Sequence, residues 1–267
     1  MDLSEQAIRS RLSGTLIGRQ IHYFQKLDST NTCAAQLAER GAVEGEVVIA
    51  DRQTRGRGRM DRLWHSPPGR NIFTSIILRP QMEPETASVI TLTAGVAVAD
   101  AISPMCQGRV RLKWPNDVLI GGRKACGILT EMKTRGKAIH YVIVGIGINV
   151  NMERGDFPGE LQRTATSLKE ETAETVSRQD VAVHLYRSFE SWYHILMTEG
   201  FERVRTRWMR YANLMGRDIE VKQKQVTQRG RIVGLDDRGA LILCDADNRR
   251  RRVLSGDITV IGDEICC

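Results

Sequence analysis

The sequence predicts an α+β protein, in which a mixed β-sheet with flanking helices forms a large first domain and a small β-barrel follows it. Two observations support this prediction. Strand-like and helix-like segments are interspersed along the first 213 residues, whereas short strand-like segments separated by turn residues fill the rest. We therefore expect one domain at residues 1–213 and a second at residues 214–267.

The first domain is expected to contain strands and helices in a mixed order. Residues 31–40 have a helical pattern that ends at Gly41, and residues 86–102 are apolar enough for a buried helix. Strands are expected where apolar and β-branched residues gather, at 46–51, 71–78, 109–114 and 141–150. The last of these is apolar almost throughout, which is typical of a central strand.

Helices are predicted just before the domain boundary. Ser177 and Asp180 have the spacing of a helix-capping pair, and apolar residues then recur at helical spacing up to Gly200. A second aromatic stripe, from Phe201 to Tyr211, follows, and both stripes are expected to face the core. The C-terminal strands are expected at 218–223, 229–235, 239–244, 249–255 and 257–261.

Composition indicates a cytoplasmic globular protein that attracts anions. The 267 residues carry a net charge of +7, which suggests nucleic acid, phosphates or an acidic protein as partners. No secretory signal or membrane-spanning run is evident, so no membrane association is expected. The cysteines form no CxxC pair and are expected to be reduced thiols; they are Cys33, Cys106, Cys126, Cys244, Cys266 and Cys267.

An arginine- and glycine-rich stretch at residues 51–66 is the first candidate site. Glycines allow backbone N–H groups to approach a ligand, and arginines donate bidentate hydrogen bonds to phosphate or carboxylate. The stretch lacks the patterns of a Walker loop and of a dinucleotide fingerprint. It is either a clamp for an anionic ligand or a mobile, solvated basic loop.

Three further polar groups follow strand-like segments. Pro115 ends one strand, which leaves Asn116 and Asp117 as a candidate Mg²⁺ site or as an ordinary Asx turn. Lys124 enters an apolar strand after a Gly-Gly hairpin and needs an anionic partner unless it lies on the surface. Asn149 follows the apolar run and is either a ligand contact or a capping residue.

Taken together and in this order, these segments resemble the biotin protein ligases, also called holocarboxylase synthetases. The resemblance covers about residues 21–265 and rests on the patterns DSTN (28–31), QxxGRGRxxRxW (53–64), SPPGRN (66–71), KWPND (113–117), RKACGIL (123–129) and GIGIN (145–149). It implies a catalytic domain similar to class II aminoacyl-tRNA synthetases and an SH3-like C-terminal barrel.

The resemblance implies a two-step reaction with biotin, ATP and Mg²⁺. Biotin and ATP form biotinoyl-5′-AMP, and the biotinoyl group then passes to one lysine of a biotin carboxyl carrier protein or domain of acetyl-CoA carboxylase or a related carboxylase. The mixed anhydride is already activated, so transfer needs no enzyme nucleophile, and no Ser-His-Asp or Cys-His arrangement is evident.

The family pattern also assigns site residues. Those implied for biotin are Ser29, Thr30, Asn31, Gln53, Gly56, Arg57, Arg59, Lys124 and Gly127. Those implied for ATP are Arg59, Arg62, Trp64, Lys113, Asn116 and Asn149, and Asp117 is implied for the metal. Lys124, Arg59, Arg62 and Lys113 are the expected catalytic cations, because two anions must be brought together.

Some members of the family carry an N-terminal winged helix-turn-helix, for which the 27 residues before Asp28 are too few. We therefore expect a ligase without that domain and without specific DNA binding. A lipoate or octanoate protein ligase and a basic nucleic-acid-binding module are the alternatives. The sequence leaves open the acceptor proteins, the base for transfer, the oligomeric state (a homodimer is one option), the role of the run Arg249–Arg252, and whether Cys126 is merely buried or faces the biotin pocket.

Overall fold

The computed structural model describes residues 3–223, 226–245 and 247–261, so Cys266 and Cys267 lie outside the described residues. The first domain contains a seven-stranded sheet in the order β1-β2-β3-β7-β6-β5-β4. Its strands are β1 Ile21–Leu27, β2 Val47–Gln53, β3 Ile72–Leu78, β4 Val110–Lys113, β5 Asp117–Ile120, β6 Arg123–Arg135 and β7 Ala138–Ile148. Because β1 and β2 are parallel and the other neighbours antiparallel, the sheet is mixed, as predicted.

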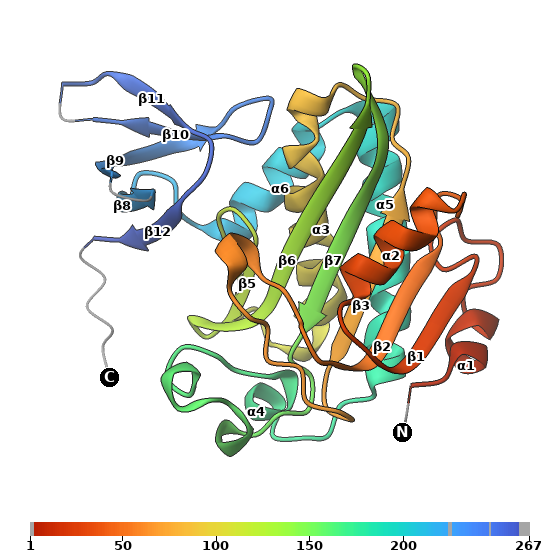
Figure 1. Cartoon of the computed structure of the whole chain (residues 1–267). Coiled ribbons are helices and arrows are strands. Elements are labelled where there is room, and N and C mark those ends of the chain that lie inside the picture. The colour runs from red at the N-terminus through yellow and green to blue at the C-terminus, as the bar shows by residue number, and fades with distance from the viewer. Residues whose placement is uncertain (1–2, 224–225, 246, 262–267) are drawn as a thin grey trace.

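Helices cover the two faces of this sheet unequally (Figure 1). The helices are α1 Glu5–Ser10, α2 Thr30–Glu39, α3 Ser88–Ile102, α4 Leu168–Thr172, α5 Arg178–Glu199 and α6 Glu202–Ala212. On one face, α3 and α5 bury the main apolar core, and α2 packs over only part of the opposite face. The rest of that opposite face is left for a pocket.

The long apolar helix belongs to the core. The stretch Pro84–Met105, which contains α3, is long and apolar enough to cross a membrane, although the sequence had suggested no such run. However, 72% of its most apolar window is buried inside the protein, and α3 packs against both α5 and α6. Its apolar character is therefore explained by burial between the sheet and these helices.

The predicted boundaries of the helices before the second domain are close to those observed. The Ser177 side chain caps α5 by accepting from the Asp180 N–H, and α5 ends at Gly200. The large aromatic residues of both stripes are fully buried or packed against the core, which confirms the sequence interpretation.

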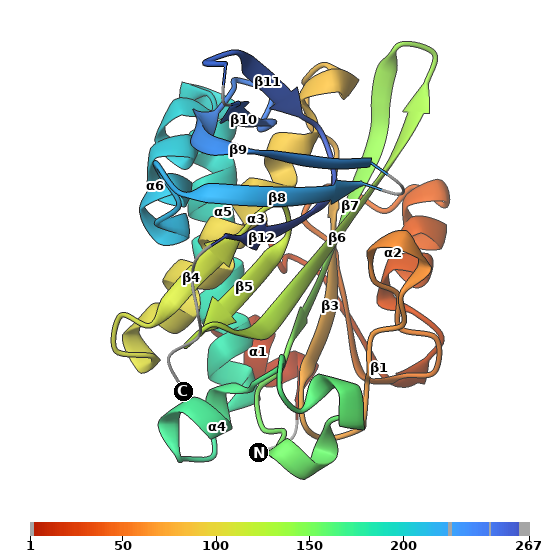
Figure 2. The ribbon, with the colours of Figure 1, turned by 90° about the vertical axis from the view of Figure 1, so that its left-hand side faces the viewer.

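The second domain is a five-stranded antiparallel sheet in the order β11-β10-β9-β8-β12. Its strands are β8 Asp218–Gln223, β9 Val226–Leu235, β10 Leu241–Cys244, β11 Arg250–Val253 and β12 Asp257–Val260. Figure 2 shows this sheet beside α6 and the β4–β5 edge of the first domain. The Trp114 indole Nε1–H donates to the Gly239 carbonyl at 3.1 Å across this junction.

Candidate active site

The floor of the pocket follows from side-chain alternation along β7. Val142, Val144, Ile146 and Ile148 belong to the main core, while Tyr141 and Ile143 pack with α2 on the other face. The next residues of that second face are Gly145, which lies under Asn31 of α2, and Gly147; both line the pocket. The alternating Gly-Ile pattern thus places large side chains toward the core and leaves a flat floor on the other face, on which the side chains of Asn31 and Trp64 lie.

Trp64 lies directly on this floor. Gly127 of β6 and Gly147 of β7 are paired neighbours, and an added Cβ at either would come within 2.7 Å of the Trp64 ring system. The indole Nε1–H is buried and has no hydrogen-bond partner among the described residues. Glycine is therefore required at both positions for the indole to lie flat against the sheet.

A cavity of about 710 Å³ extends from this floor to the second domain. It is lined by the predicted residues Ser29, Thr30, Asn31, Gln53, Arg57, Arg59, Arg62, Trp64, Lys113, Asn116, Asp117, Lys124, Gly127 and Asn149. The remaining predicted residue, Gly56, is buried beside the lining, where an added Cβ would come within 2.7 Å of the Trp64 carbonyl and the Ser66 hydroxyl. The structure thus brings the predicted set together around one cavity, while their individual roles toward a ligand stay predictions.

One end of the cavity is neutral and polar. The Thr30 N–H and hydroxyl both donate to Gln53 Oε1, at 2.8 and 3.1 Å, and Gln53 Nε2 donates to the Ser66 hydroxyl at 3.2 Å. Ser29 is 3% exposed and adjoins them at the start of α2. This group suits a ligand with its own neutral donors and acceptors, such as a cyclic urea.

Both the nitrogen and the oxygen of the Asn31 side-chain amide are hydrogen-bonded within the protein. Its amide donates to the Leu129 carbonyl at 3.1 Å and to Glu131 at 2.7 Å, and its Oδ1 accepts from the Ser75 hydroxyl at 2.6 Å. An added Cβ at Gly145 would come within 2.0 Å of that oxygen. Asn31 therefore ties α2 to the sheet in this structure.

The arginine-rich stretch forms a folded loop in which three of its five arginines meet a polar partner. Arg57 pairs with Glu131 at 2.8 Å, and Arg62 pairs with Asp257 of β12 at 2.6 Å. The Arg59 guanidinium donates to Asn116 Oδ1 at 2.9 Å, and burial lowers the pKa of Arg59.

The backbone of the loop is tightly turned. The Gly58 N–H donates to the Arg62 carbonyl at 2.7 Å, and Met60 has a positive φ of 56°. Positive φ is uncommon for a residue with a long side chain.

Lys124 reaches the cavity through a β-bulge. Leu119 pairs with Lys124 and Val118 with Cys126, so Ala125 is an extra residue in β6. The Lys124 ammonium lies 2.6 Å from Asp117 Oδ1 and 5.4 Å from the centre of the Trp64 ring. Asp117 is therefore the anionic partner that the sequence required for Lys124.

The end of β4 adds a second cation to this side of the cavity. Lys113 pairs with Asp117 in the β4–β5 ladder and lines the cavity, and its ammonium makes no polar contact within the described part of the chain. Asn116 is fixed on β6, because its amide donates to the Ile128 carbonyl at 2.9 Å.

Asn149 lines the cavity and is also hydrogen-bonded to other residues of the chain. Its amide donates to the Thr166 carbonyl at 3.0 Å, and its N–H donates to the Ala125 carbonyl at 2.8 Å. This geometry corresponds to the capping role that the sequence left open, so Asn149 anchors the loop that follows β7.

The described residues offer few ligands for a divalent metal ion. No group of three or more His, Cys, Asp or Glu side chains converges within residues 3–223, 226–245 and 247–261. Asp117 offers one carboxylate, and Lys124 already pairs with it. The residues fit Mg²⁺ only where phosphate oxygens supply most of the coordination, which is the usual way that Mg²⁺ binds beside a nucleotide.

Several site residues were missed in the sequence. Glu131, Asp257 and the segment 163–165 line or brace the cavity, yet they come from a strand interior, the second domain and an irregular loop. No local pattern marks them. Cys126 is 0% exposed, does not line the cavity, and has a pKa raised by burial, so it is a packed core side chain.

Comparisons with known proteins agree with this geometry. The sequence model of the Biotin/lipoate A/B protein ligase family matches residues 23–149, and that of the Biotin protein ligase C terminal domain matches residues 214–260. The chain is 40% identical to the bifunctional ligase/repressor BirA of Bacillus subtilis, over 96% of this chain and 78% of that protein. It is 36% identical to the biotin–[acetyl-CoA-carboxylase] ligase of Paracoccus denitrificans, over 82% and 91%.

The chain belongs to the biotin protein ligases. A solved structure of the biotin protein ligase from Aquifex aeolicus, in complex with biotin and ATP, superposes with a TM-score of 0.76 at 26% identity. That alignment covers 91% of this chain and 98% of the Aquifex chain, so the α+β fold with a small second β domain is shared. The family resemblance read from the sequence motifs is confirmed.

Proposed function

We propose that the cavity around Trp64 and Lys124 holds biotin and ATP together and that its cations join them. The chain is an ATP-dependent biotin protein ligase, in line with its relatives. The observation that supports this use of the cavity is its polarity: the Gln53 end is neutral, and cations surround the Lys124 end. A ureido head group would lie at the first end, and a carboxylate and a triphosphate at the second.

The chain's own residues explain how two anions are held together. The ureido group of biotin would bond to Ser29, Thr30 and Gln53, and its bicyclic ring would lie near the glycine floor. Lys124, Arg59 and Arg62 would then face the biotin carboxylate and the α-phosphate. Their charge offsets the repulsion between the two anions and the charge that develops as the carboxylate attacks phosphorus and pyrophosphate leaves.

Mg²⁺ enters this proposal as a partner of the nucleotide. Asp117 would contribute one ligand, and Mg²⁺ would neutralise part of the triphosphate charge when bound. Asp117 also holds the Lys124 ammonium, so the metal and the lysine share one carboxylate.

The second step transfers the biotinoyl group to a lysine of a biotin carboxyl carrier domain. The Paracoccus relative is named for acetyl-CoA carboxylase, which supports the carrier domain of that enzyme as the acceptor. No enzyme nucleophile is needed, because AMP is a good leaving group from the mixed anhydride. The C-terminal biotin ligase match and the named relatives favour biotin over lipoate.

We further propose a division into domains at residues 213 and 214, in support of which the second sheet begins at β8 and the C-terminal family model at residue 214. Cytoplasmic location and the absence of specific DNA binding are also proposals. Residues 3–20 form one six-residue helix and turns, and contain no helix-turn-helix. A homodimer remains a proposal that sedimentation would test.

The deciding experiment is acceptor labelling. The purified enzyme, biotin, Mg-ATP and a carrier domain should give one biotinylated lysine, whereas lipoate in place of biotin should give none. Labelling with lipoate at a comparable rate, or none with biotin, would contradict the proposal. A carrier whose target lysine is replaced by arginine is the matched control.

A further inference from the structure

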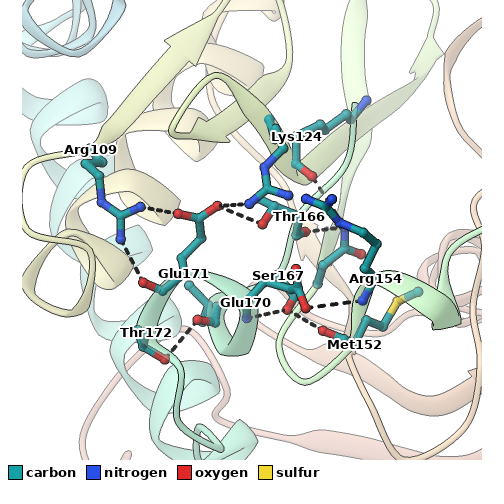
Figure 3. A network of polar contacts seen from close by, with 12 residues as sticks. Arg109, Lys124, Met152, Arg154, Thr166, Ser167, Glu170, Glu171 and Thr172 are labelled. Atoms are coloured by element: carbon teal, nitrogen blue, oxygen red, sulfur yellow. Dashed lines mark hydrogen bonds and ion pairs between the residues drawn. The ribbon is translucent and has the colours of Figure 1, made fainter. Parts of the chain in front are cut away.

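Next to the cavity lies a buried carboxylate that the reaction described above does not use (Figure 3). The side chain of Glu171, in α4, is 3% exposed. Its Oε1 accepts from the Thr166 hydroxyl at 2.8 Å and from the Arg123 guanidinium at 2.9 Å, and its Oε2 accepts from Arg109. Glu171 does not line the cavity, so a bound ligand would not touch it.

The groups that Glu171 joins lie on both sides of Lys124. Arg123 is the preceding residue of β6, and Thr166 belongs to a segment that runs parallel to Lys124 in an isolated β-bridge centred on Ala165. The Lys124 N–H donates to the Thr164 carbonyl at 2.8 Å, and the Lys124 carbonyl accepts from the Thr166 N–H at 2.9 Å. The backbone of Lys124 is therefore held by this segment.

The bulge in β6 explains why Lys124 depends on these bonds. A bulge interrupts the regular ladder and turns a side chain to a new direction. The carbonyl of the extra residue Ala125 accepts from the Asn149 N–H. The backbone of Lys124 is hydrogen-bonded to the 164–166 segment, so β6 is not held at the bulge by β5 alone. If that segment shifted, Lys124 would lose both backbone partners and its ammonium would leave the vicinity of Asp117.

We propose that Glu171 is a positioning residue that sets where the Lys124 ammonium lies during adenylate formation. The proposal rests on the proposed function, because it assigns Lys124 to the reaction of biotin with ATP. The buried Glu171 carboxylate holds both Arg123 and Thr166. Arg123 precedes Lys124 in β6, and Thr166 is hydrogen-bonded to the Lys124 carbonyl, so the bulge is held at both of these points. An error of about 1 Å in the position of such a cation reduces the rate by about a hundredfold.

Glu171→Gln tests this inference, because the amide has nearly the same shape but no charge to hold two arginines. The rate of biotin-dependent pyrophosphate release at saturating substrates should fall about 10- to 100-fold. The KM for biotin should stay within about threefold, because Glu171 lies outside the cavity. The matched control is Glu170→Gln, whose carboxylate accepts only from the Arg154 N–H at 3.2 Å among the described residues.

A double-variant cycle separates positioning from general damage. In a Lys124→Gln background, Glu171→Gln should change the residual single-turnover rate by less than about twofold, because the group that it positions is gone. An equal loss in both backgrounds would overturn the inference. Should Glu171→Gln fail to fold, Thr166→Val serves instead, since it removes one of the bonds to Glu171 and should give a smaller loss of the same kind.

Two negative results have different meanings. A wild-type enzyme without biotin-dependent pyrophosphate release would overturn the proposed function and this inference with it. An active wild type together with Glu171→Gln equal in rate to Glu170→Gln would overturn this inference alone.

Discussion

Replacing Lys124 by alanine should nearly abolish adenylate formation while leaving the fold intact. Its side chain is about one-third exposed and its ammonium pairs with Asp117 at 2.6 Å, so the side chain lies at the edge of solvent. At an effective dielectric constant of about 20, two unit charges about 4 Å apart attract by about 4 kcal/mol. If the transition state gains that attraction, its loss lowers the rate about a thousandfold.

The same geometry predicts a partial rescue. Without Lys124, the carboxylate of Asp117 faces the incoming anions unpaired and repels them. At a Mg²⁺ concentration that saturates both variants and so offsets the lost metal ligand, Lys124→Ala with Asp117→Asn should therefore release pyrophosphate faster than Lys124→Ala alone. Pyrophosphate release and thermal unfolding should be measured on all variants. A Lys124→Ala rate within a few-fold of wild type, or a double variant slower than the single one, would refute the reasoning.

Three further predictions concern the glycine floor of the cavity, the ion pair between Arg178 and Asp51, and the arginine-rich loop. Gly147→Ala should raise the KM for biotin about 5- to 150-fold, because overpacking against the indole costs about 1–3 kcal/mol. Arg178→Met should lower the free energy of unfolding by about 3–5 kcal/mol, because it breaks a buried ion pair with Asp51. Trypsin should cut first within residues 55–62, and biotin with Mg-ATP should protect this loop, since bound anions would hold its arginines.

Each of these predictions has a matched control. Gly155→Ala should leave the KM unchanged, because no atom lies within 4 Å of its added Cβ. Arg203→Met removes an exposed helical ion pair and should leave the denaturant midpoint of unfolding almost unchanged. Equal effects in variant and control would contradict either prediction. A first tryptic cut elsewhere, or a cutting rate unchanged by saturating ligands, would contradict the third.

Most of the fold could be read from the sequence because its signals are local. The apolar run at 141–150 and the Ser177 cap correspond to β7 and α5 within a few residues. β1 was not assigned from local pattern, since only two of its seven residues, Ile21 and Leu27, are aliphatic, and of these only Ile21 is buried. Its place is fixed by parallel pairing with β2, which is a long-range contact.

The site was predictable where it rests on unusual residue combinations and not elsewhere. The arginine-rich loop and the GIGIN segment were each ambiguous alone, and only their occurrence together with KWPND, in this order, indicated the site through the family resemblance. Glu131 and Asp257 are ordinary charged residues on strands, and only the tertiary fold brings them to Arg57 and Arg62.

The ion pairs around the cavity fall into two physical kinds. Those that face the ligand space are exposed: Arg57 and Glu131 are 45% and 38% exposed, and Arg62 and Asp257 are 66% and 44% exposed. Exposed pairs contribute about 0–1 kcal/mol, so a carboxylate or phosphate can replace the acid at little cost. The Glu171 carboxylate is of the other kind, because it is only 3% exposed and does not line the cavity, although its partner Arg123 does. Under the proposed function, the cations that meet the ligands can therefore exchange their partners, while the backbone on either side of Lys124 stays fixed by Glu171.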